Sequence, residues 1–131
     1  IRLTGGEPML RRDFPELVAK LAGLKASGLN TTGLKDLAMT TNATLLAGQA
    51  ALLKEKGLSH INISLDSFKP ERFEQITRLS CFDAVKAGLH EAIAAGFSKL
   101  KLNMVVITGF NDDEILDFAA FAREHKINVR F

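Results

Sequence analysis

The chain has 131 residues, of which 17 are Lys or Arg and 15 are Asp or Glu, so its formal net charge is +2. Hydrophobic residues make up 47% of it and charged residues 24%, which excludes a disordered tail, a coiled coil and a highly basic nucleic-acid-binding arm. No apolar run approaches the roughly 18 residues of a membrane span, and no signal-peptide pattern opens the chain. The length fits one domain with its own hydrophobic core.

The first half of the chain alternates between β-type and helical periodicity. A β-type run at residues 1–4 is followed by apolar residues spaced i, i+3, i+4 and i+7, which predict a helix over residues 14–21. A polar connection, residues 25–33, then leads to a second β-type run at residues 37–41. The next helical pattern occupies residues 45–57 and ends at a glycine, as helices commonly do.

The second half repeats this alternation. A β-type run at residues 61–65 precedes two helical patterns, one beginning with proline at residues 70–76 and a longer one at residues 82–96. After a β-type run at residues 100–107, Asn111 is expected to cap a final amphipathic helix. Strands alternating with helices in this way predict a parallel α/β sheet with right-handed crossovers.

The chain opens inside one predicted strand and closes inside another, at residues 127–131. We therefore expect a piece of a longer protein, truncated at both ends, with no domain boundary inside residues 1–131. The single cysteine, Cys81, excludes an internal disulfide framework and a self-contained cysteine metal site, and it favours a cytoplasmic location. The histidines have no metal-ligand spacing, so no metal site is predicted in the chain itself.

Each of the five predicted strands carries polar residues at every second position, whereas strands of a parallel sheet are usually apolar on both faces. The residues that share the polar face are Arg2 with Thr4, Thr40 with Asn42, Asn62 with Ser64 and Asp66, Lys101 with Asn103, and Asn128 with Arg130. If the strands curve into a barrel, this face forms a net positive inner wall that suits an anionic small molecule. A flat sheet with one solvated face remains the alternative.

Polar residues and glycines also collect where the strands end, and ligand sites of parallel sheets lie at the carboxyl ends of their strands. Gly5 and Gly6 follow the first strand and allow the backbone to approach a ligand closely, with the Glu7 carboxylate beside them. A glycine pair is also compatible with a simple turn, so this feature alone decides nothing.

The motifs together identify a resemblance. Ile1-Arg2-Leu3-Thr4-Gly5-Gly6-Glu7-Pro8, Thr40-Thr41-Asn42 and Asn62-Ile63-Ser64-Leu65-Asp66 resemble the radical S-adenosylmethionine (SAM) superfamily, in which Gly-Gly-Glu-Pro holds the amino group of SAM. With Lys101-Leu102-Asn103 and the Gly-Phe-Asn-Asp-Asp-Glu run at residues 109–114, the whole chain is similar to the GTP 3′,8-cyclases of molybdenum cofactor biosynthesis.

This resemblance implies that residues 1–131 are one fragment of a radical SAM partial (β/α)6 barrel. It implies an enzyme that uses SAM and a [4Fe-4S] cluster to convert GTP to (8S)-3′,8-cyclo-7,8-dihydroguanosine 5′-triphosphate, with no nucleic-acid or membrane partner and with a homodimer as a possible assembly. It assigns SAM contacts to Gly5, Gly6, Glu7 and Ser64, and GTP contacts to Arg2, Thr40, Lys101 and Arg130. It assigns no catalytic residue.

The chain also departs from the family pattern. The Cys-x3-Cys-x2-Cys loop that holds the SAM-binding cluster is absent, and Cys81 matches neither of the family's two cluster sets, so the chain alone is predicted to be inactive. Ala43 stands where a glycine is usual, and Lys69 where an acidic residue often precedes Pro70. The alternatives are another radical SAM enzyme, such as a peptide-modifying maturase, and a cluster-free nucleotide-binding module. Cysteines upstream in the parent sequence would discriminate between enzyme and module.

Overall fold

The computed structural model describes residues 1–26, 34–97 and 99–131, so most of the predicted polar connection at residues 25–33 lies outside the described residues. Five strands form one parallel sheet in the order β1-β2-β3-β4-β5. The strands are β1 (Arg2–Leu3), β2 (Ala38–Thr41), β3 (His60–Ser64), β4 (Lys99–Asn103) and β5 (Asn128–Arg130).

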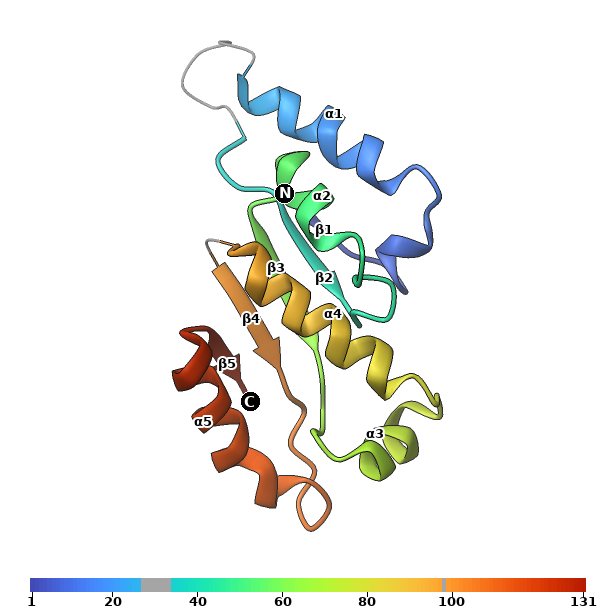
Figure 1. Cartoon of the computed structure of the whole chain (residues 1–131), viewed down its shortest axis with the longest axis vertical. Coiled ribbons are helices and arrows are strands. Elements are labelled where there is room, and N and C mark those ends of the chain that lie inside the picture. The colour runs from blue at the N-terminus through green and yellow to red at the C-terminus, as the bar shows by residue number, and fades with distance from the viewer. Residues whose placement is uncertain (27–33, 98) are drawn as a thin grey trace.

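Helices alternate with the strands (Figure 1). The α-helices are α1 (Phe14–Ala26), α2 (Ala50–Glu55), α3 (Pro70–Thr77), α4 (Phe82–Ala95) and α5 (Ile115–His125), and the 3-10 helices are η1 (Pro8–Leu10) and η2 (Asp112–Glu114). The element order predicted from periodicity is confirmed. Two elements are several residues shorter than predicted: α2 does not fill the pattern at residues 45–57, because residues 44–49 form turns instead, and β4 ends at Asn103 rather than at residue 107.

Each strand lies beside the next one along the chain, so successive right-handed crossovers place the helices on the same face of the sheet. Figure 1 shows α4 crossing in front of the strands and α5 running alongside β5. Among the described residues, β1 and β5 are the two edges of the sheet, so it does not close into a barrel. The predicted fold class, a partial (β/α) barrel of parallel strands, is confirmed in this open form.

The helix-facing side of the sheet forms the core. Met39, Ile61 and Leu100 are aligned across three neighbouring strands, and all three are 4% exposed or less. Phe118 of α5 and Leu89 of α4 are buried in the same cluster. Each such side chain contributes about 1.5–3 kcal/mol when fully buried, so this face accounts for much of the folding free energy.

Helices α2 and α4 support each other through side chains that complete one another's ends. The Glu91 carboxylate of α4 accepts hydrogen bonds from the backbone N–H of Gly48, just before α2, and, at 3.3 Å, from that of Ala50, the first residue of α2. In return, Lys54 Nζ of α2 donates to the carbonyls of Ala95 and Gly96, at 2.6 and 2.8 Å, where α4 ends. Because the first N–H groups and last carbonyls of a helix have no partner within it, these contacts satisfy groups that would otherwise need water.

The close approach of α4 to the turn after β2 depends on Gly88. A Cβ atom at this position would lie 2.6 Å from the Ala43 carbonyl oxygen and 3.0 Å from Leu46 Cβ. We expect Gly88→Ala to lower the free energy of unfolding by about 1–3 kcal/mol, the usual cost of overpacking.

Urea unfolding of Gly88→Ala beside a matched helical control, Gly23→Ala, measures this effect. A Cβ at Gly23 meets no atom within 4 Å, and alanine favours helices, so the control should be neutral or stabilising by up to about 1 kcal/mol. Equal unfolding midpoints for the two variants would show that the space at Gly88 does not matter.

Candidate functional site on the inner face of the sheet

The sheet face opposite the helices carries the polar residues predicted for it. The strand register aligns Thr40, Asn62, Lys101 and Asn128 in one row across β2 to β5. It aligns Ser64, Asn103 and Arg130 in a second row, nearer the carboxyl ends of the strands. The prediction that these residues share one face is confirmed by this register.

Depth along the strands separates the predicted site residues into two groups. Ser64 lies in the row nearest the carboxyl ends, and Thr40 and Lys101 lie one row deeper, roughly 7 Å away at two residues of rise. Arg2 is aligned with Ala38, one row deeper again. The predicted SAM contact on β3 therefore lies at the rim, while three of the four predicted GTP contacts lie below it. The fourth, Arg130, shares the rim row two strands from Ser64, roughly 10 Å away.

The inner face is cationic. Among the described residues, Arg2, Lys101 and Arg130 form no ion pair. An open groove of about 380 Å³, lined by Lys99, Lys101, Asn128, Val129 and Arg130, follows β4 and β5. Its volume lies within the roughly 300–1,000 Å³ of typical ligand sites, and its charge favours an anion.

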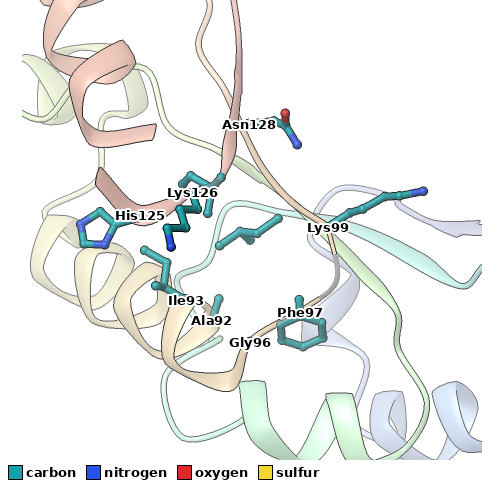
Figure 2. Close-up of a pocket in the computed structure, with 10 residues that line it drawn as sticks. Ala92, Ile93, Gly96, Phe97, Lys99, His125, Lys126 and Asn128 are labelled. Atoms are coloured by element: carbon teal, nitrogen blue, oxygen red, sulfur yellow. The ribbon is translucent and has the colours of Figure 1, made fainter. Parts of the chain in front are cut away.

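A second hollow is a poorer candidate. It holds about 150 Å³ and lies where α4 and α5 end, with Gly96, His125 and Lys126 among its lining residues (Figure 2). It also borders Lys99 and Asn128, the first residues of β4 and β5, so it lies at the end of the sheet opposite the predicted rim. Its size and position do not suit a nucleotide.

The fold itself does not require glycine at the two positions after β1. Neither Gly5 nor Gly6 has a positive φ, and a Cβ built at either would meet no atom within 4 Å. Their own environment would therefore accept a side chain. A glycine pair on an open rim allows a ligand to approach the backbone, and the SAM contacts of Gly5 and Gly6 stay a prediction.

Glu7 has a structural role that the sequence did not reveal. Its Oε1 accepts hydrogen bonds from the Met9 N–H at 3.1 Å and the Thr41 hydroxyl at 2.8 Å, and its Oε2 accepts from the Asn42 N–H at 2.8 Å. The carboxylate therefore joins the loops after β1 and β2. A contact between Glu7 and SAM stays a prediction.

Ala43, next in this loop, occupies the left-handed region with φ 63° and is fully buried. Glycine adopts this conformation at lower cost than other residues, which explains why the family pattern favours glycine here.

Asn103 is a polar residue to which sequence reasoning gave no role. Its Oδ1 atom is buried, and no described residue donates a hydrogen bond to it. The residue lies between Ser64 and Arg130 in the rim row. A buried acceptor without a partner costs about 1–3 kcal/mol, and a ligand N–H or O–H on this face would satisfy it. Its position on the polar face was the available signal.

Asp66 and Asn111 join the loops after β3 and β4. Asp66 Oδ1 accepts from the Val105 N–H at 2.8 Å, and Asn111 Nδ2 donates to the Asp66 carbonyl at 2.8 Å. The expectation that the Asn111 side chain caps a helix was wrong, because both its amide atoms bond these loops and none bonds the helix that follows.

The residues described here do not fit an iron–sulfur cluster. The one cysteine, Cys81, is half-buried at the start of α4, and no described group of three His, Cys, Asp or Glu residues could hold a metal ion. A [4Fe-4S] cluster needs three or four thiolates. None of the helices in the described ranges is long and apolar enough to span a bilayer.

Comparison with known proteins gives matches over the whole chain. The model of the radical SAM superfamily matches residues 1–122. The chain is 47% identical over all 131 residues to a protein named GTP 3′,8-cyclase from Moorella thermoacetica, and it covers 38% of that relative. The mitochondrial GTP 3′,8-cyclase of Arabidopsis thaliana is also 47% identical over 131 residues, of which the chain covers 32%. The chain thus spans about a third of the length of these relatives.

Proposed function

Because this chain belongs to the radical SAM superfamily, we propose that it forms the central part of a GTP 3′,8-cyclase. The observation that carries the proposal is the inner face of the sheet, where unpaired cations lie below an open glycine rim. The similarity to relatives named GTP 3′,8-cyclase over the full chain supports the same reaction. Such a protein acts in molybdenum cofactor biosynthesis, and residues 1–131 are one fragment of its partial (β/α)6 barrel.

The rim residues suit SAM. Gly5 and Gly6 offer backbone groups without steric cost, and the exposed Ser64 hydroxyl lies in the rim row of β3. Glu7 holds this loop against the loop after β2 and is the fourth proposed SAM contact. When bound and reduced by one electron from the cluster, SAM would be cleaved to methionine and a 5′-deoxyadenosyl radical that can abstract a hydrogen atom. The ligands of the [4Fe-4S] cluster lie outside this chain, so no step is assigned to residues described here.

The cations of the inner face suit GTP, and of its proposed contacts only Arg130 lies in the rim row. Lys101 and Arg130 border the groove along β4 and β5, and Arg2 adds a third cation at the far edge of the sheet. Charge-assisted hydrogen bonds from lysine and arginine to phosphate oxygens are among the strongest polar contacts in proteins. The Thr40 hydroxyl lies in the Lys101 row, between Arg2 and Lys101 across the sheet. Together these groups would hold the substrate in one orientation, which a ring closure between its ribose and base requires.

The setting follows from the same proposal. A protein with one cysteine in this segment suits a reducing compartment, and we place it in the cytoplasm. Its partners are GTP and SAM, without nucleic acid or membrane, and the complete protein is a candidate homodimer.

Anaerobic turnover of the complete protein tests the proposal. With SAM, a reductant and GTP deuterated at C3′, we expect the cyclised nucleotide by mass spectrometry and deuterium in the released 5′-deoxyadenosine. Cleavage of SAM without consumption of GTP would point to a different radical SAM enzyme, such as a peptide-modifying maturase. Nucleotide binding without SAM cleavage would point to a cluster-free module.

A further inference from the structure

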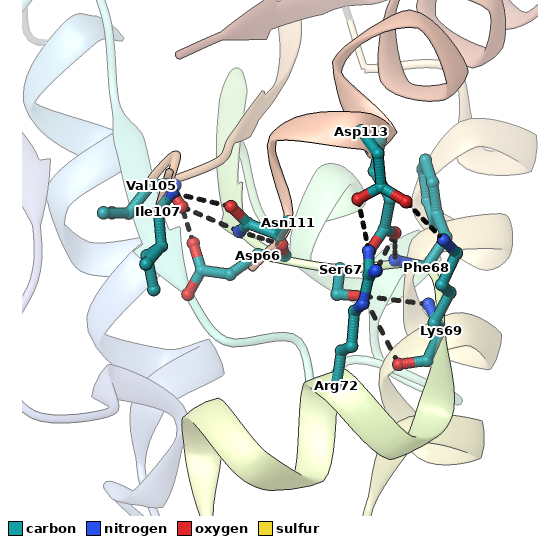
Figure 3. Close-up of polar contacts among 10 residues, drawn as sticks. Asp66, Ser67, Phe68, Lys69, Arg72, Val105, Ile107, Asn111 and Asp113 are labelled. Carbon is teal, nitrogen blue, oxygen red and sulfur yellow. Dashed lines mark hydrogen bonds and ion pairs between the residues drawn. The ribbon is translucent and has the colours of Figure 1, made fainter. Parts of the chain in front are cut away.

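Two loops at the rim are joined by polar side chains over long sequence distances (Figure 3). The loop after β3, residues 65–69, carries Ser67, and the loop after β4, residues 104–114, carries Asn111 and Glu114. Arg72 of α3 reaches the same cluster. We call Ser67, Arg72, Asn111 and Glu114 the loop clamp.

Glu114 is the centre of the loop clamp. It is fully buried, and its carboxylate accepts from the Ser67 hydroxyl at 2.8 and 3.0 Å, from the Phe68 N–H at 2.8 Å and from Arg72 Nη1 at 2.9 Å. An ionised carboxylate is stable in a protein interior only when it is paired and hydrogen-bonded in this way. The loop after β3 therefore cannot move away from Glu114 without leaving a buried charge unsatisfied.

Asn111 makes the second connection. Its Nδ2 donates to the carbonyls of Asp66 and Val105 at 2.8 and 2.9 Å, and its Oδ1 accepts from the Ile107 N–H at 2.6 Å. Asn111 is fully buried, and the Asp66 carboxylate accepts one more hydrogen bond, from the Val105 N–H. The two loops are thus bonded both where they leave the sheet and further out at Glu114.

An exposed ion pair completes the cluster. Asp113 contacts Arg72 and, at 2.8 Å, Lys69 Nζ. Hydrogen bonds from Arg72 and then Lys69 lower the pKa of Asp113 to about 2. A carboxyl whose pKa is lowered by folding stabilises the fold fully when the pH is above its ordinary pKa of 3.8. It loses that contribution as the pH falls through the lowered pKa of about 2, so this ion pair stays formed at neutral pH.

We propose that the loop clamp is a positioning device for SAM, a proposal that rests on the proposed function. Ser64 and Asn103 are partners in the strand register, and they are the last residues of β3 and β4 before the clamped loops begin. The Leu65 N–H donates to the Asn103 carbonyl at 3.0 Å, so the clamp acts directly beyond the proposed SAM contact. Ser67 and its partners are positioning residues and are not proposed to contact SAM. They fix the place of Ser64, and a displacement of about 1 Å at such a site is costly.

The predicted signature is selective. Arg2, Thr40 and Lys101 lie at least one row deeper than Ser64 and, within the described residues, form no bond to the loop clamp, so these three GTP contacts should not depend on it. In the same part of the chain, Arg130 is bonded to the loop after β4 only through its backbone carbonyl, which accepts from the Met104 N–H at 2.8 Å, so its side chain is not held by the clamp either. Loss of the Ser67 hydroxyl should weaken SAM binding about 5- to 30-fold. This range assumes that part of the free energy of one hydrogen bond to a charged group is lost from SAM binding.

The test compares Ser67→Ala with Thr77→Ala in the complete protein, by calorimetric titration of SAM and of GTP and by thermal unfolding. The Thr77 hydroxyl donates to the Phe73 carbonyl at 2.8 Å within α3 and bonds nothing in the loop after β4, so Thr77→Ala also removes a hydrogen-bonding hydroxyl, together with a methyl group, without touching the clamp. We expect the SAM dissociation constant to rise only in Ser67→Ala, with GTP affinity unchanged in both.

Arg72→Gln provides a second variant, because glutamine still donates to Glu114 and keeps the buried carboxylate partnered if Ser67→Ala fails to fold. It should also weaken SAM binding selectively. A folded Ser67→Ala or Arg72→Gln protein with unchanged SAM affinity would overturn the proposed role of the loop clamp but not the proposed function. Parallel losses of SAM and GTP affinity would do the same. A wild-type protein that does not bind SAM would overturn the proposed function as well.

Discussion

Lys101→Ala in the complete protein is expected to weaken GTP binding about 10- to 150-fold and to leave SAM binding unchanged. The range corresponds to about 1.5–3 kcal/mol for hydrogen bonds to a charged group, at 1.4 kcal/mol per tenfold. The physical reason is position: Lys101 lies on the inner face, borders the groove along β4 and β5, and forms no ion pair with any described residue. Calorimetric titration of each ligand measures both effects.

The control is Lys86→Ala, which makes the same change of net charge on α4, a helix on the opposite face of the sheet. Lys86 is exposed there, so its removal should leave both affinities unchanged. Equal losses for GTP and SAM in Lys101→Ala would indicate a folding defect, and unchanged GTP affinity would return Lys101 to an ordinary solvated lysine.

The second large expected effect is the complete absence of cluster binding and SAM cleavage in the isolated chain. The 131-residue chain alone, reconstituted without oxygen with iron and sulfide, is expected to hold no [4Fe-4S] cluster and to leave SAM intact. It has one cysteine where a cluster needs three or four, and that residue packs half-buried at the start of α4. Iron and sulfide analysis and an assay for 5′-deoxyadenosine measure the result. Cys81→Ser should behave like wild type, and stoichiometric iron in either protein would contradict the expectation.

The sequence was most informative where local periodicity decides the structure. The alternation in β3 predicted that Asn62 and Ser64 face one side of the sheet and Ile61 and Ile63 the other. The exposed fractions of the last two residues agree, because Ser64 is exposed and Ile63 is fully buried. Strand alternation has a period of two regardless of the tertiary fold, so this prediction needed no knowledge of the neighbours.

Prediction failed where contacts join distant segments. The bond between Thr41 and Glu7 spans 34 residues, and that between Ser67 and Glu114 spans 47, so no local pattern indicates either. The alternation of β3 predicts Asp66 on the polar face, yet its carboxylate accepts a hydrogen bond from the Val105 N–H in the next loop and does not cap the turn before α3. Ser67 makes that turn instead, accepting from the Lys69 N–H at 3.0 Å.

The ligand that each site residue binds does not follow from its position in the sheet. The structure places Arg2, Thr40, Ser64, Lys101 and Arg130 on one face, but placement on a face does not choose a ligand for each. Their assignments to SAM and GTP come from the resemblance to the family, and they stay predictions that the titrations above test.

The most direct test of the central claim, that SAM and GTP share the inner face of this sheet, is a crystal structure of the complete protein with both ligands. We expect SAM against Gly6 and Ser64, and triphosphate oxygens within about 2.7–3.2 Å of the Lys101 and Arg2 nitrogens. Either ligand seated instead on the helix side of the sheet, such as the groove between α4 and α5 beside Phe68 and Phe121, would contradict the account.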